Sequence, residues 1–122
     1  MQEMRELQER IKSLPVEVQE KILRFVNEKG YRPVFLREGE EVDAKESHSS
    51  SSIAFYDEWW STLAGSPEFT ETRQSKWQAG WAGGRTICYR IKFKRGDVVA
   101  RKVEDGRSME FRTVREIYIC AD

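Results

Sequence analysis

The chain has 122 residues with 21 basic and 21 acidic side chains, so its formal net charge is zero. Apolar residues make up 39% of the chain and charged residues 34%, a composition that suits one globular domain and excludes a collagen-like chain or a disulfide scaffold. No apolar run approaches the length of about 18 residues that a membrane span requires. The chain shows no charged-then-apolar leader, so we expect a cytoplasmic protein without a membrane partner.

Apolar residues recur at steps of three and four through residues 1–29, a spacing typical of amphipathic helices. We predict a short helix at about 3–13 and a longer one at about 15–29. Pro15 separates them, because proline disrupts a helix interior but suits a first turn. Gly30 follows as a C-terminal stop signal.

Residues 13–26 contain the pattern LP-x-x-x-Q-x-x-x-L-x-F-V. In this pattern the segment resembles the opening helix of small prokaryotic antitoxin-like proteins. The resemblance covers about fourteen residues, and nothing after Gly30 extends it. It implies a chain that acts by occupying another protein.

The next residues predict a short strand and then a loop. Residues 31–37 have a β-prone, apolar centre, and Pro33 favours an edge position or a strand start because it cannot donate to a ladder. Residues 38–52 are acidic and then serine-rich, which predicts a flexible loop.

The centre of the chain is the hardest part to assign. Aromatic residues spaced by three and four across residues 53–64 favour a helix, with a strand as the alternative. In residues 66–84, Pro67 could open a helix through about Gln78. Threonines and glycines in the same stretch favour a partly irregular segment.

Residues 85–120 predict an antiparallel meander of three strands. Apolar and polar residues alternate here, as in strands with one buried and one solvated face. Asp105 and Gly106 tolerate positive φ and predict a hairpin turn. Residues 1–122 are therefore expected to form a single α+β domain, with N-terminal helices packed on an antiparallel sheet of four or five strands.

Cysteine and histidine are scarce, which limits the chemistry. Cys88 and Cys120 have no metal-binding spacing, so we predict no metal or other cofactor and expect both thiols to be reduced, with a disulfide as the alternative. His48 lies in the serine-rich stretch, where a solvated loop histidine is favoured over a catalytic base. No catalytic residue is predicted, and an enzyme is the least favoured class.

Charge is distributed unevenly along the chain. Residues 38–58 hold seven acids and one lysine, a balance of −6, whereas residues 73–102 hold nine bases and one acid, a balance of +8. A basic region of this kind is either an ordinary solvated sheet face or a surface that binds phosphates.

Residues 76–85 combine two tryptophans, three glycines and flanking cations. Indole rings can stack on bases and cations can pair with phosphates, although the same tryptophans could serve as core residues. The favoured hypothesis is a non-enzymatic protein that binds a nucleotide or single-stranded nucleic acid through this loop and the basic strand face. The predicted ligand-binding residues are Lys76, Trp77, Trp81, Arg85, Arg90 and Lys92.

The alternative hypothesis is a protein-interaction module, such as an antitoxin-like or phage-encoded inhibitor. The acidic stretch could attract a basic partner, and one of the adjacent tryptophans at 59 and 60 could lie at an interface. A homodimer is also compatible with a neutral chain of this size. The predicted partner-binding residues are Trp60, Glu40, Glu41 and Asp43.

Overall fold

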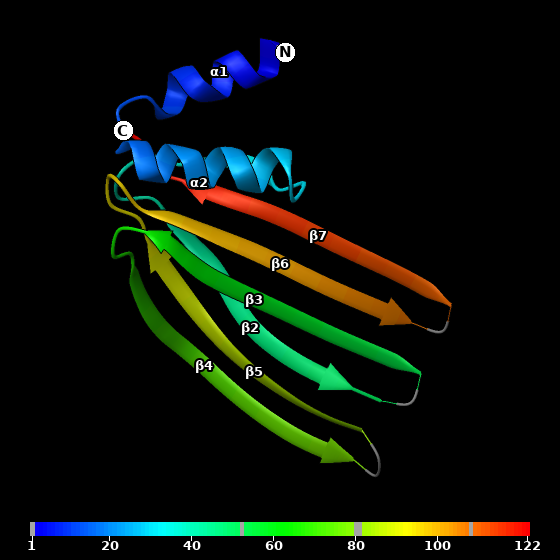
Figure 1. Ribbon diagram of the computed structural model, residues 1–122. Helices are drawn as coiled ribbons and strands as arrows, with labels where there is room; N and C mark the ends of the chain where they lie inside the picture. The colour runs from blue at the N-terminus through cyan, green and yellow to red at the C-terminus, as the bar shows by residue number, and fades with distance from the viewer. Residues whose placement is uncertain (1, 52, 80–81, 108) are drawn as a thin grey trace.

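A computed structural model describes residues 2–51, 53–79, 82–107 and 109–122, and the fold in these residues is mostly β (Figure 1). Two short helices precede all the strands. The elements are α1 (Gln2–Ile11), α2 (Val16–Asn27), β1 (Arg32–Phe35), β2 (Glu41–Ser50), β3 (Ala54–Ala64), β4 (Glu68–Ala79), β5 (Ala82–Lys92), β6 (Val98–Arg107) and β7 (Glu110–Ile119).

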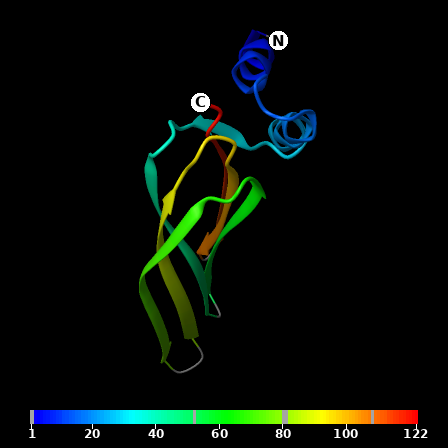
Figure 2. The ribbon, with the colours of Figure 1, turned by 90° about the vertical axis from the view of Figure 1, so that its left-hand side faces the viewer.

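The described strands form one seven-stranded sheet in the order β1-β7-β6-β3-β2-β5-β4. β1 runs parallel to β7, and every other neighbouring pair is antiparallel. The sheet is strongly twisted, and β4 and β5 lie at the edge that is far from the helices (Figure 2). β4 is therefore an edge strand at the opposite side of the sheet from β1.

The two helices cover one end of the sheet, where they pack against β1, the ends of β3 and β7 and the start of β6 (Figure 1). Ile11 and Ile22 come from the apolar stripes of α1 and α2 and are fully buried. They pack in one cluster with Ile117 and Ile119 of β7 and with Val98 of β6. None of the helices in the described chain is long and apolar enough to span a membrane.

A second apolar cluster joins the strands themselves. Trp60 of β3 and Val99 of β6 pack with Phe93, which follows β5, and with Cys120, which follows β7. The ring of Tyr118 lies beside this cluster, 5.1 Å from the ring of Trp60 between centroids. This cluster holds β5 against the β3–β6–β7 part of the sheet at one end of the strands only.

The predicted fold class is wrong. The sheet has seven strands and is mixed, instead of an antiparallel sheet of four or five strands, and the helices cover only part of it. A C-terminal meander over residues 85–120 does not form, because β5 lies between β2 and β4 and only β6 and β7 pair with each other. The helices within residues 1–29 and the edge strand within residues 31–37 are confirmed.

The prediction of a flexible loop at residues 38–52 is also wrong, because Glu41–Ser50 form β2. β2 lies between β3 and β5 and pairs with both. Serine and acidic residues have a low propensity for β-strands. In β2, pairing with strands on both sides satisfies the backbone hydrogen-bonding groups, and this tertiary context outweighs the low propensity.

Within residues 53–64, Ala54–Ala64 form β3, the strand alternative, instead of a helix. Within residues 66–84, Glu68–Ala79 form β4, and β5 begins at Ala82. Successive side chains of a strand point to opposite faces, so Trp60 is buried while its neighbour Trp59 is 44% exposed. The aromatic spacing of three and four had favoured a helix, but this run is also rich in residues that favour strands.

The predicted hairpin turn at Asp105 and Gly106 does not form either, because both residues lie inside β6. Gly106 is required there for a packing reason. A β-carbon at this position would lie 2.3 Å from the ring of Phe55 on β3, so the ring packs directly over the glycine backbone.

Candidate anion-binding surfaces

Two of the predicted ligand-binding cations, Arg90 and Lys92, have acidic neighbours in the sheet. Arg90 is paired with Asp43 on β2, and its Nε lies 3.5 Å from the Asp43 carboxylate and 3.6 Å from that of Glu41. Lys92 lies in register between Glu41 on β2 and Glu68 on β4. The acidic and basic regions that are separate in the sequence therefore neutralise each other where β2 pairs with β5.

The opposite end of β5 has a different environment. Arg85 lies in register between His48 on β2 and Lys76 on β4. Directly paired residues of neighbouring strands share a face, so Lys76, Arg85 and His48 form one row. Within the described residues neither Lys76 nor Arg85 makes an ion pair, and His48 Nδ1 is paired with the carboxylate of Asp57.

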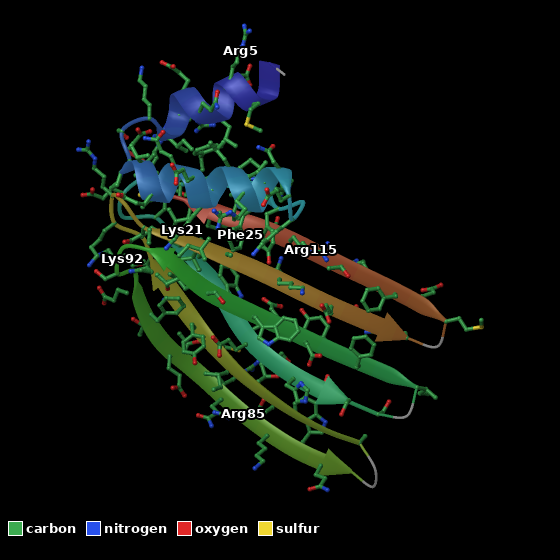
Figure 3. The ribbon with its side chains drawn as sticks, viewed as in Figure 1. Arg5, Lys21, Phe25, Arg85, Lys92 and Arg115 are labelled. Carbon is green, nitrogen blue, oxygen red and sulfur yellow. The ribbon has the colours of Figure 1, made fainter. Side chains whose placement is uncertain are left out.

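This basic row borders a depression of about 520 Å³ that we call the hairpin hollow. Gly83 lies between Ser50 and Gln78 in the register, so it leaves the centre of the hollow without a side chain. Figure 3 shows Arg85 in the part of the sheet remote from the helices. The hollow is lined by His48, Ser50, Lys76, Trp77, Gln78, Ala82, Gly83, Gly84 and Arg85.

The indole of Trp77 lies on the other face of the β4–β5 pair from Lys76 and Arg85. Trp77 pairs with Gly84, and a β-carbon on Gly84 would lie 2.1 Å from the indole ring. The ring therefore packs over the glycine and is 47% exposed. The second tryptophan of the predicted loop, Trp81, lies outside the described residues. The predicted cations and the described indole thus belong to opposite faces of the hairpin.

A larger depression of about 730 Å³, which we call the central hollow, lies among β2 to β7. One side of it is formed by aromatic and charged residues of β3, β6 and β7, and the other by residues of β2, β4 and β5. Its lining comprises Asp43, Ala44, Lys45, Glu58, Trp60, Thr72, Arg73, Cys88, Tyr89, Arg90, Arg101 and Tyr118.

A buried polar network holds one wall of the central hollow in place. Glu58, only 3% exposed, accepts hydrogen bonds from the hydroxyl of Tyr56 at 2.5 Å, from Trp60 Nε1 at 2.9 Å and from Arg101 Nε at 3.1 Å. Arg101 also donates to Glu116 at 2.8 Å. Every charge in this network has a partner, so its wall is rigid and its carboxylate is not free to act as a base.

The network shifts the pKa values of its members. Burial, with the nearby Glu58 carboxylate, raises the pKa of Tyr56 to about 12, and burial, with the charge of Glu116, raises the pKa of Tyr118 to about 12. Burial alone would raise the pKa of Glu116, but hydrogen bonds from Arg32, Arg101 and Tyr118 outweigh burial and lower it. At neutral pH the two phenols are therefore protonated donors, and the Glu116 carboxylate is a charged acceptor.

The predicted partner-binding residues are not assembled into one surface. Trp60 is buried in the central cluster, and Trp59 is the exposed member of the pair, with the Lys102 ammonium 5.8 Å from its ring centroid. Glu41 and Asp43 are engaged by Arg90, and the Glu40 carboxylate accepts a hydrogen bond from a backbone N–H in its own turn.

The described residues contain no group of three or more side chains that could hold a metal ion. Cys88 and Cys120 are both free thiols, as expected for reduced cysteines, and Cys120 is buried. His48 lies on a strand instead of in a loop, with an exposed side chain paired to Asp57.

Several residues that line these two surfaces were not predicted from the sequence to bind a ligand. Lys45 and Arg73 of the central hollow and His48 of the hairpin hollow become neighbours of β5 only through the pairing of β2 and β4 with it. The alternation of charged and apolar residues from Glu41 to Lys45 is a period-two signal that could have indicated the strand.

Comparison with known proteins gives no family. No family model matches the chain, and no curated protein matches it. Among solved structures, a cysteine protease inhibitor from Entamoeba histolytica is a distant neighbour, with 8% sequence identity and a TM-score of 0.34 over 77% of this chain and 90% of that one.

Proposed function

We propose that the protein binds a nucleotide or a single strand of nucleic acid, and that the hairpin hollow receives its phosphates. The supporting observation is the position of Arg85, which lies in register between Lys76 on β4 and His48 on β2. Arg90 and Lys92, on the same strand, have acidic neighbours instead.

Cross-strand electrostatics explain why this row favours an anion. Like charges directly opposite each other on neighbouring strands are destabilising, and Lys76 and Arg85 are such a pair. A phosphate between them would relieve the repulsion and accept charge-assisted hydrogen bonds from both. Gly83 leaves room for the ligand to approach the backbone, and Ser50 and Gln78 add neutral donors.

Trp77 gives this surface a means to distinguish a long ligand from a short one. Trp77 lines the hollow, but its half-exposed indole packs over Gly84, on the face of the hairpin opposite to the side chains of Lys76 and Arg85. A strand that passed around the outer edge of β4 could place a base on the ring, where stacking is worth about 1–3 kcal/mol.

The proposal is tested by measuring the affinity of a fluorescent single-stranded oligonucleotide, and of a fluorescent mononucleotide, at low and moderate salt. Charge reversal of Lys76→Glu with Arg85→Glu should weaken binding of both ligands by about tenfold or more, since each charged hydrogen bond is worth roughly 1.5–3 kcal/mol. Affinity of the wild type should fall steeply with salt, because phosphate contacts release counterions.

The matched control is Lys94→Glu with Arg95→Glu, which makes the same change in net charge in the turn between β5 and β6. The control should retain most of the wild-type affinity, because these cations lie at the other end of the strand from the hollow. Equal losses in the two double variants, or no binding to wild type at low salt, would overturn the proposal.

A second candidate function, protein interaction, is favoured by the outer edge of β4. β4 pairs only with β5, and residues 68–78 are exposed on both faces of the sheet. An edge of this kind can accept a strand from a partner. A β-bulge at Thr72 and several charged side chains interrupt this edge, and both features normally discourage such pairing. A chain that stays monomeric at every concentration and co-purifies with no protein would count against this second candidate.

A further inference from the structure

A row of side chains across the central hollow places two cations on either side of a thiol. Cys88 on β5 is in register with Lys45 on β2 and with Arg73 on β4. All three line the hollow. Within the described residues, neither Lys45 nor Arg73 makes an ion pair.

The other charged residues of the lining are already neutralised. Arg101 is held by Glu58 and Glu116, and Arg90 lies beside Asp43. In total four cations and two carboxylates line the hollow, which leaves an excess of two positive charges. The excess positive charge therefore belongs to Lys45 and Arg73.

The facing wall is aromatic. Trp60 and Tyr118 lie 5.1 Å apart between ring centroids and tilt by 31° from parallel. The Trp60 ring is fixed by its hydrogen bond to Glu58 at 2.9 Å, and Tyr118 by its hydrogen bond to Glu116 at 3.1 Å. A wall of fixed rings opposite two cations that lack ion pairs is suited to a ligand with a flat apolar part and an anionic part.

The backbone of β4 departs from regular pairing at the same place. The register of β4 against β5 shifts between Glu71 and Arg73, and the extra residue, Thr72, lines the hollow. Bulges are frequent beside binding sites, where they redirect a side chain. Here the shift places Arg73 on the row of Cys88.

We propose that the central hollow is a second binding site, separate from the hairpin hollow, for a small organic anion with an aromatic ring, such as an aryl phosphate or aryl carboxylate. Its ring packs against the partly exposed Tyr118, beside the mostly buried Trp60, and its anionic group lies between Lys45 and Arg73. A volume of about 730 Å³ is within the range of sites for such molecules.

Phenyl phosphate is the probe, and its two halves, inorganic phosphate and phenol, are tested separately. Titration is followed by two signals from the hollow: the NMR resonance of the Trp60 indole N–H, and the rate at which iodoacetamide alkylates Cys88. Cys120 is buried and serves as the internal control for alkylation. Phenyl phosphate should shift the Trp60 resonance and slow Cys88 alkylation at concentrations at least tenfold lower than either half, because only it makes both sets of contacts.

The variant Lys45→Gln with Arg73→Gln should weaken phenyl phosphate binding by about tenfold or more, since it removes both charge-assisted contacts. The matched control, Lys94→Gln with Arg95→Gln, removes two exposed cations from the turn between β5 and β6 and should leave phenyl phosphate affinity unchanged. Unchanged affinity in Lys45→Gln with Arg73→Gln, or equal responses to phenyl phosphate and phenol, would overturn the inference without affecting the oligonucleotide result.

Discussion

The helix-covered end of the sheet and the β4–β5 hairpin belong to one continuous sheet but are held together differently. At the covered end, Ile117 and Ile119 are fully buried beneath the helices. In β4, every side chain from residue 68 to residue 78 is exposed, and only β5 pairs with the strand. Stability is concentrated in the first region, and both proposed binding surfaces draw on the second.

This division resembles the general separation of scaffold and binding surface in proteins. Regions with few buried apolar contacts open locally at lower free energy, and such regions often hold ligands. In the exposed hairpin, the like charges of Lys76 and Arg85 lie opposite each other on neighbouring strands. In a packed core, two unpaired charges would be much more costly because they would be removed from water. The following predictions test the contrast, from the largest expected effect to the smallest.

Truncation of a core side chain should separate the two regions most clearly. Ile117→Ala should lower the free energy of unfolding by about 2–5 kcal/mol, because it leaves a cavity beneath the helices. Phe69→Ala on β4 should cost about 1 kcal/mol, because that ring is 37% exposed and loses mainly its edge contact with Tyr89. Urea denaturation measures the free energy of unfolding of both variants. Similar decreases in the two variants would contradict the proposed difference in stability between the two regions.

Alkaline pH should weaken the central network that lies between the two regions. The pKa values of Tyr56 and Tyr118 are raised from 10.0 to about 12, so the folded protein holds these protons more tightly than the unfolded chain. Their contribution is fully present below pH 10.0 and is lost as the pH rises to about 12. The effect should be smaller than core truncation because both phenols are only partly buried.

Urea denaturation across this pH range measures the loss. The double variant Tyr56→Phe with Tyr118→Phe should have a flatter profile than wild type between these pH values. A profile as steep as that of the wild type would show that other groups cause the alkaline loss.

The smallest effect is expected from Lys76→Glu in the hairpin. It replaces an opposed pair of like charges with an ion pair to Arg85, which should stabilise the protein by about 0.2–1 kcal/mol. The same change should weaken oligonucleotide binding, so stability and affinity should move in opposite directions. Thermal unfolding measures the stability of Lys76→Glu, with Lys94→Glu as the control. A lower stability of Lys76→Glu than of the wild type would contradict the placement of Lys76 opposite Arg85.

Local patterns in the sequence were sufficient for part of the fold. The three- and four-residue spacing through residues 1–29 located both helices, and alternation located most of β5, β6 and β7. Pro33 placed β1 at an edge, where it pairs with β7 on one side only. In each case the signal is a property of consecutive residues.

The rest depended on pairing between distant segments. The second half of β2 is polar and serine-rich, and its strand conformation depends on pairing with both β3 and β5. Gly106 was taken for a turn residue because the ring of Phe55, about fifty residues earlier in the chain, could not be placed over it from sequence. The number of strands and their order could not be derived without these contacts.

The candidate site was predicted in the same partial way. Lys76 and Arg85 were chosen together, and they are direct neighbours in the sheet. Arg90 and Lys92 were grouped with them because all four are basic and close in sequence, but their acidic neighbours on β2 and β4 depend on register. A charge count along the chain cannot distinguish a cation with a basic neighbour from one with an acidic neighbour.

The most direct test of the account is a map of backbone amide NMR shifts on addition of a single-stranded oligonucleotide. The account predicts the largest shifts at His48, Lys76 and Gly83 to Arg85, with little change in α1, α2 or β7. Shifts centred on the helix-covered end, or on Arg90 and Lys92 without the hairpin hollow, would contradict it.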